Sequence, residues 1–145
     1  DVIWGFDFLP DGRMIYTEKS GKMSIFDPMT KSVTLLKNVP KVYDAGQAGL
    51  LDVRVHPDFT KNNLIFFTYS EPVGDKSTTA LGRAELKGDE LQNVKKIFSA
   101  WKPSGEDIHY GSRIVFDGKG HIFFAVGDRN SREKVQDIKY HNGKV

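Results

Sequence analysis

Short runs in which apolar and polar residues alternate recur along this chain, and turns rich in Pro, Asp and Gly interrupt them. The pattern occurs three times, in residues 8–17, 55–69 and 114–125. In each copy a run of β-branched and aromatic residues follows the turn, which is the sequence form of a β-hairpin. The turn aspartates are Asp11, Asp58 and Asp117, separated by 47 and 59 residues. A period of about 50 residues with short strands predicts the blades of a β-propeller.

Further alternating segments follow the first two hairpins. Four of them predict the outer strands of two sheets: residues 21–27, 32–36, 79–86 and 94–98. No segment carries an apolar stripe over the roughly 10–12 residues that a helix needs. The chain is therefore predicted to be all-β. We expect a first blade at about residues 1–40, a second at about 48–100 and the start of a third at about 109–145.

The length of the chain limits the number of propeller blades that it can form. With 145 residues, 39% of them hydrophobic, the chain has enough apolar surface for one modest core. Propellers close with about 4–8 blades, so two blades and part of a third cannot complete a ring. We expect a fragment that ends within a strand at residues 141–145 and that pairs with the remaining blades or with a second chain. The alternative is a small sandwich that is complete at this length.

Composition excludes several classes of function. The net charge is +2, and the Lys and Arg residues are scattered among Asp and Glu, so nucleic acid is not an expected partner. No apolar run approaches the roughly 18 residues of a membrane span. The chain has no cysteine, which excludes disulfides and cysteine-based metal sites.

His109 stands at the entry of a predicted strand, just ahead of the third hairpin. An imidazole at the mouth of a β-structure suits general-base chemistry, because its ordinary pKa of about 6.5 lies near working pH. Asp128 follows the hairpin and is a candidate partner for the ring. The alternatives are a histidine satisfied by backbone groups and a turn aspartate that caps its own backbone.

Several motifs, taken in order, resemble one protein family. They lie at residues 4–13, 46–53, 56–59, 109–113, 115–117, 127–128 and 143–145. Together they are similar to the soluble quinoprotein glucose and aldose sugar dehydrogenases, the glucose/sorbosone dehydrogenase family. The resemblance implies a six-bladed propeller that carries pyrroloquinoline quinone (PQQ) and calcium. It further implies oxidation of the anomeric carbon of an aldose to a lactone, hydride transfer to PQQ, reoxidation by an external electron acceptor, and a periplasmic or secreted location.

The resemblance also implies roles for single residues. His109 matches the general base, and Gln47 matches a position that reaches the sugar or the cofactor, the alternative being a loop glutamine at a blade crossover. Asp128 is the candidate that could accept the ring N–H of His109. Independently of the resemblance, Arg129 and Asn130 follow Asp128 on a loop that could bind substrate, the alternative being a solvated loop. The calcium ligands and most quinone-binding basic residues are expected outside this segment, so no metal ligand is nominated here.

Other functions stay open at this point. Ile108 stands before His109 where the family commonly has Asp or Asn, which favours a non-catalytic propeller fragment that acts as a binding or scaffold module. A metal-dependent lactonase propeller is disfavoured, because the sequence shows no converging set of Glu, Asp and Asn ligands.

Overall fold

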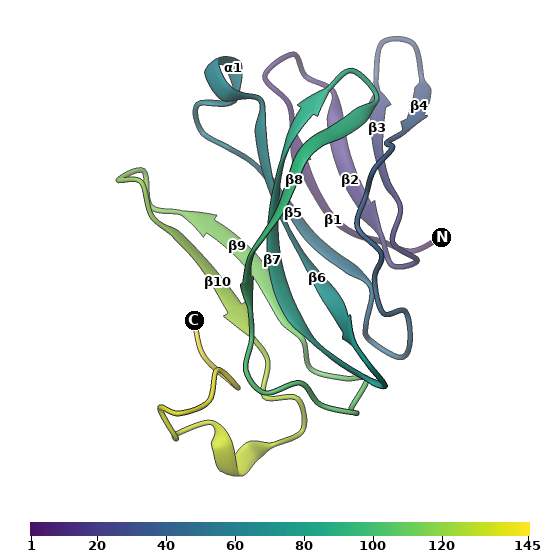
Figure 1. The fold of residues 1–145 in the computed structure, drawn as a ribbon. Helices are drawn as coiled ribbons and strands as arrows, with labels where there is room; N and C mark the ends of the chain where they lie inside the picture. Colours follow the sequence, from purple (N-terminus) through teal and green to yellow (C-terminus); the bar gives the residue numbers. More distant parts are fainter.

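Three antiparallel sheets make up the computed structural model, which describes residues 1–145 (Figure 1). The first sheet contains β1 (Ile3–Phe8), β2 (Met14–Glu18), β3 (Met23–Asp27) and β4 (Ser32–Leu35) in that order. The second contains β5 (Leu50–Val55), β6 (Leu64–Val73), β7 (Lys76–Lys87) and β8 (Glu90–Ser99). The third is the hairpin of β9 (Gly111–Phe116) and β10 (Ile122–Val126). Helical structure is limited to the single turn α1 (Phe59–Asn62) and the 3-10 turn η1 (Arg132–Lys134).

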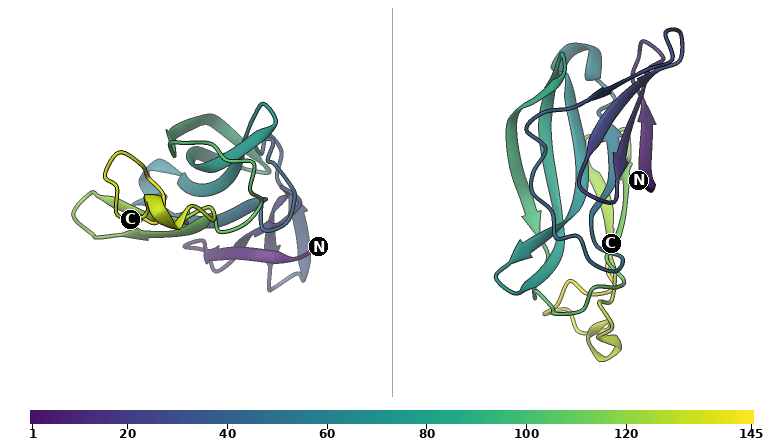
Figure 2. Two further views of the ribbon diagram at one scale, coloured as in Figure 1. Left: turned by 90° about the horizontal axis from the view of Figure 1, so that it is seen from below. Right: turned by 90° about the vertical axis from the view of Figure 1, so that its right-hand side faces the viewer.

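The sheets pack face to face along their first strands. β1 and β2 contact β5, and β5 and β6 contact β9, so the first strand of each sheet lies beside the first strand of the next (Figure 2). Four-stranded antiparallel sheets arranged in this way are blades of a β-propeller. The predicted all-β propeller class is confirmed, and the four segments predicted as outer strands coincide with β3, β4, β7 and β8.

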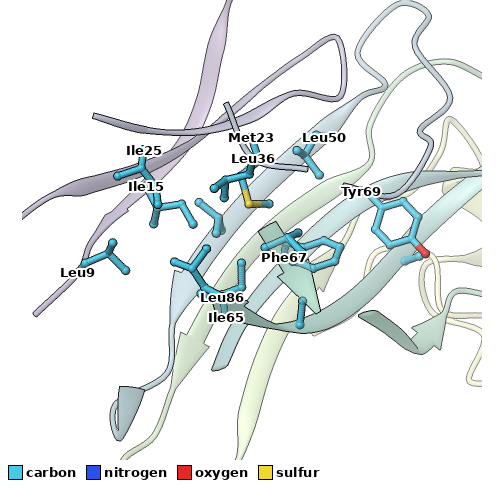
Figure 3. Close-up of a cluster of buried hydrophobic side chains, with 14 residues drawn as sticks. Leu9, Ile15, Met23, Ile25, Leu36, Leu50, Ile65, Phe67, Tyr69 and Leu86 are labelled. Atoms are coloured by element: carbon cyan, nitrogen blue, oxygen red, sulfur yellow. The ribbon is translucent and has the colours of Figure 1, made fainter. Parts of the chain in front are cut away.

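A hydrophobic core fills the space between the first two sheets (Figure 3). Ile15 and Met23 enter it from one side, and Ile65 and Phe67 from the other, all four fully buried. The ring of Phe67 lies over Gly82, where an added Cβ would stand 2.6 Å from the ring. A glycine inside β7 therefore leaves room for the largest fully buried side chain of this core.

Two buried or half-buried carboxylates join the first strands across the sheet boundaries. Asp7 on β1 accepts the N–H of Val55 on β5 at 2.9 Å, and Asp52 on β5 accepts the N–H of Ile114 on β9 at 2.8 Å. Both donors stand three residues before the turn aspartate of their own repeat. The repeat thus places one carboxylate bond at each boundary, and this fixes the position of β9 relative to β5.

The carboxyl-terminal residues differ from the sequence prediction. Residues 141–145 form turns, with a single bridge between Lys144 and Val126, instead of the expected strand. His141 accepts the N–H of Trp101 on its Nδ1 atom at 2.8 Å and lies against Phe98. These contacts hold the segment beside the loop that leads to β9. No helix in the structure has the length and apolar character needed to cross a membrane.

Candidate active site

His109 and Asp128 meet at the open end of the β9–β10 hairpin. His109 precedes β9 by two residues and Asp128 follows β10 by two, so the hairpin register brings them together. The Nδ1 atom of His109 lies 2.8 Å from Oδ1 of Asp128. The His109 side chain is 45% exposed and that of Asp128 25% exposed. The two residues that the sequence nominated as base and partner are thus in hydrogen-bond contact at the surface.

Two glycines allow the chain segments to approach this closely. An added Cβ at Gly127 would stand 1.8 Å from the carbonyl oxygen of His109, so no other residue fits without a backbone shift. Gly111 has a φ of 78°, and a Cβ there would stand 2.7 Å from the carbonyl oxygen of Ala125. The Gly127 N–H donates to the carbonyl of Tyr110 at 2.9 Å. The local sequence therefore sets the separation of the histidine and the carboxylate.

Hydrogen bonds favour the ionised form of Asp128. The bond from the His109 ring has the largest effect and the N–H of Asn130 adds a second, so the pKa of this carboxyl lies below its usual value. An ionised carboxylate only accepts hydrogen bonds, so Nδ1 of His109 carries the proton. The lone pair of the neutral imidazole is then on Nε2. A neutral His109 held in this way can accept a proton at that atom.

Gln47 contacts the histidine from the loop before β5. Its side-chain Oε1 atom accepts the backbone N–H of His109 at 2.9 Å, and the backbone N–H of Gln47 donates to the backbone carbonyl of Asp107 at 2.7 Å. Gly46 lies against the Asp107 side chain, and a Cβ there would stand 2.5 Å from the carboxyl carbon. Gln47 therefore positions His109 with one end of its amide, while the Nε2 end has no partner within the chain.

A cavity of about 250 Å³ lies beside these residues, where β1, β5 and β9 come together. It is lined by Trp4, Gln47, Leu51, Tyr110, Gly111 and Ser112. Trp4 received no role from the sequence, although it belongs to a motif of the resemblance. The signal that would have indicated Trp4 is an aromatic residue on the first strand of a sheet, near the strand end where His109 was predicted to lie.

Arg129 and Asn130 take different positions. Asn130 is exposed beside Asp128, which fits a solvated loop as well as a substrate-binding one. Arg129 is only 2% exposed, and its guanidinium carbon lies 3.5 Å from the centre of the Tyr110 ring. Burial lowers the pKa of this guanidinium. Arg129 therefore packs inside the chain instead of presenting its charge to the solvent.

The side chains of this chain do not form a metal-binding cluster. No group of three or more His, Cys, Asp or Glu side chains is arranged to hold a metal ion. A second cavity, of about 180 Å³, lies at the other end of the β9–β10 hairpin and is bordered by His56, His121 and two phenylalanines. This cavity lies at the turn of the hairpin, whereas His109 and Asp128 lie at its open end.

Comparison with known proteins places the chain in a family. The sequence model of the Glucose / Sorbosone dehydrogenase family matches residues 1–145, and the chain belongs to this family. It is 37% identical over 150 residues to the aldose sugar dehydrogenase YliI of Escherichia coli (strain K12), covering 100% of this chain and 40% of that protein. It is 31% identical over 143 residues to quinoprotein glucose dehydrogenase B of Acinetobacter calcoaceticus, covering 91% of this chain and 29% of the relative.

Solved structures agree with the fold. The soluble aldose sugar dehydrogenase of Escherichia coli in its apo form superposes with a TM-score of 0.94 at 35% identity, over 99% of this chain and 42% of that one. The PQQ-bound aldose sugar dehydrogenase of Streptomyces coelicolor shares the fold, with a TM-score of 0.86 at 23% identity, over 97% of this chain and 42% of that one. This chain thus spans about two fifths of the length of these proteins.

Proposed function

We propose that this chain is the part of a quinoprotein sugar dehydrogenase that carries the general base. The whole protein oxidises the anomeric carbon of an aldose sugar to a lactone, with His109 as the base. The pair of His109 and Asp128, 2.8 Å apart and open to solvent, is the observation that carries the proposal. Membership of the Glucose / Sorbosone dehydrogenase family supplies the reaction class.

The residues of this chain perform the proton half of the oxidation. Nε2 of His109 removes the proton of the anomeric hydroxyl while the hydride leaves the same carbon, so the C–O single bond becomes the C=O bond of the lactone. Asp128 accepts the Nδ1–H of the ring, holds the tautomer and stabilises the imidazolium that forms. Gln47 fixes the backbone of His109, and its free Nε2 amide donates to the sugar or the cofactor.

Residues that line the cavity next to His109 would hold one edge of PQQ. When bound, it supplies the hydride acceptor, and an external electron acceptor then reoxidises it. Trp4 provides a flat apolar wall and Gln47 a free amide donor, which suit one edge of a planar quinone that carries polar groups. Calcium does not fit the residues of this chain, because no group of acidic side chains converges. It stays a proposal for the whole protein, and no step here uses it.

The outer faces of the structure are suited to further blades. Phe6 and Phe8 on β1 are 51% and 59% exposed, and Val115 and Phe123 on the third sheet are 54% and 49% exposed. Apolar side chains of this size on both flanks are typical of sheets that pack against others. We infer that the remaining blades of a six-bladed ring, or a second chain, cover them, and that the boundaries near residues 40, 48, 100 and 109 separate blades. A periplasmic or secreted location completes the proposal.

The test uses the full-length protein with PQQ, calcium and a panel of aldoses, and a redox dye as the external acceptor. We expect dye reduction that requires both PQQ and the sugar, with the lactone as the product. PQQ binding seen by absorbance without any sugar-dependent dye reduction would contradict the proposal. That result would favour the second candidate, a non-catalytic binding or scaffold propeller, which the apolar Ile108 next to His109 supports.

A further inference from the structure

Arg129 is the most buried cation near the candidate base. Its Nη2 atom donates to Oγ of Ser77 at 3.3 Å and to the carbonyl of Glu106. Its Nε and Nη1 atoms are buried and have no partner. Burying a guanidinium with part of its donors unpaired is unfavourable, so folding alone does not explain an arginine here.

The residues on either side show what Arg129 is joined to. Tyr110 follows His109, and Arg129 follows Asp128, so the two dipeptides face each other across the end of the hairpin. On the open side, the ring of His109 bonds to Asp128 at 2.8 Å. On the buried side, the guanidinium of Arg129 stacks on the ring of Tyr110 at 3.5 Å. The two contacts hold the same pair of backbone segments together from opposite faces.

The backbone at this point needs such a restraint. His109 and Arg129 both adopt left-handed conformations, with φ of 55° and 52°, and neither is a glycine. Residues persist in this region only where their surroundings fix them. Tyr110 is itself anchored at two points. Its side-chain hydroxyl lies 2.5 Å from Oγ of Ser77, and its backbone carbonyl accepts the hydroxyl of Thr79. Arg129 therefore stacks on a ring that the second sheet holds in place.

From these contacts we propose that Arg129 is a positioning residue for the base, and that its stack on Tyr110 holds the two backbone segments in place so that His109 stays in hydrogen-bond contact with Asp128. This inference rests on the proposed function for its catalytic consequence, but not for its structural one. Arg129 does not reach the solvent. It acts by keeping Nδ1 of His109 on the carboxylate and Nε2 directed outward.

The test compares Arg129→Met with the wild type in the full-length protein loaded with PQQ. Methionine keeps the volume and removes the unpaired donors, so thermal stability should be unchanged or higher. The hydrogen-bonded Nδ1–H proton of His109, identified by its loss in His109→Gln, should disappear from the proton NMR spectrum. We expect kcat to fall about 10- to 100-fold with KM nearly unchanged, as for a misplaced catalytic group.

Controls separate this role from a purely structural one. Arg113→Met removes an exposed arginine on the same hairpin, 65% exposed, and should leave the NMR signal and kcat unchanged. If Arg129→Met fails to fold, Arg129→Lys replaces it, because it keeps the charge and loses the planar stack. A wild-type Nδ1–H signal in the folded Met or Lys variant overturns the inference. The NMR signal is read without any turnover, so the proposed function can fail while this inference stands.

Discussion

Two histidine–aspartate pairs lie at opposite ends of the β9–β10 hairpin, and their contacts are almost the same. Nδ1 of His109 lies 2.8 Å from Asp128, and Nδ1 of His121 lies 2.7 Å from Asp117. Both carboxyls have a lowered pKa. For Asp117 it falls to about 2, because the Lys119 N–H and then the His121 ring donate to it. For Asp128 the His109 ring has the largest effect.

The surroundings of the two pairs differ. His121 and Asp117 belong to one turn, four residues apart, and the His121 side chain is 70% exposed. His109 and Asp128 are 19 residues apart, and Gln47 on the loop before β5 accepts the backbone N–H of the histidine. We propose that the contact of His121 and Asp117 closes a turn, whereas the contact of His109 and Asp128 orients a base.

Removing the carboxylate charge gives the largest expected contrast. Asp128→Asn should lower kcat about 10²- to 10⁴-fold, because the amide does not hold the Nδ1–H tautomer of His109. Asp117→Asn should leave kcat unchanged, since the residue lies at the turn end. Steady-state kinetics of the two full-length variants, both loaded with PQQ, decide this. Equal losses in the two variants would show that the pairs are not functionally distinct.

Adding a methyl group to a glycine at each end should give the next largest effect. Gly127→Ala places a Cβ 1.8 Å from the His109 carbonyl, so it should destabilise by more than the roughly 1–3 kcal/mol of ordinary overpacking and reduce activity. Gly118→Ala meets no atom within 4 Å, but its φ of 72° costs an alanine about 1–2 kcal/mol. Urea unfolding measures both. A Gly127→Ala protein that is stable and fully active would contradict the close approach.

Gln47 offers a smaller test of how the base is held. Gln47→Ala removes the acceptor for the His109 N–H, a bond worth about 1 kcal/mol, so kcat should fall about fivefold. Gln47→Glu keeps an acceptor oxygen and should preserve kcat, while losing the amide donor should raise KM for the sugar. Measuring kcat and KM separately in both variants distinguishes the two ends of the amide. A loss of kcat in the Glu variant as large as in Ala would count against this assignment.

The pH dependence of stability should show the smallest effect. The folded-state pKa of Asp117, about 2, lies below its ordinary 3.8, so its contribution to stability is present above pH 3.8 and is lost as pH falls toward 2. Asp117→Asn should therefore flatten the acid dependence of the unfolding free energy in this window. Asp128→Asn should change it in the same direction. An unchanged acid slope in both variants would exclude the hydrogen bonds as its source.

The sequence predicted the fold and the central pair because both depend on local patterns. Alternation and Pro/Asp/Gly turns specify hairpins, and a hairpin places the residue before its first strand beside the residue after its second. His109 and Asp128 are such residues, so their contact followed from the pattern. Trp4 joins the site through packing between sheets, so the alternation and turns of a single hairpin do not assign it a role.

The burial of Arg129 could not be predicted from the sequence. A charged residue after a strand indicates a solvated or ligand-facing loop, and its burial depends on Tyr110 and Ser77 from other segments. The strand expected at residues 141–145 was wrong for a related reason. The segment has few apolar residues. The side chain of His141 contacts Phe98 and the backbone N–H of Trp101, and the backbone of residues 141–145 forms turns.

The most direct test of this account is the turnover of two histidine variants in the full-length protein loaded with PQQ. His109→Gln and His121→Gln each remove an imidazole bonded to a carboxylate at one end of the same hairpin. We predict that His109→Gln binds PQQ, as seen by absorbance, but oxidises aldoses about 10²- to 10⁴-fold more slowly, while His121→Gln turns over at the wild-type rate. Wild-type turnover in His109→Gln would contradict it.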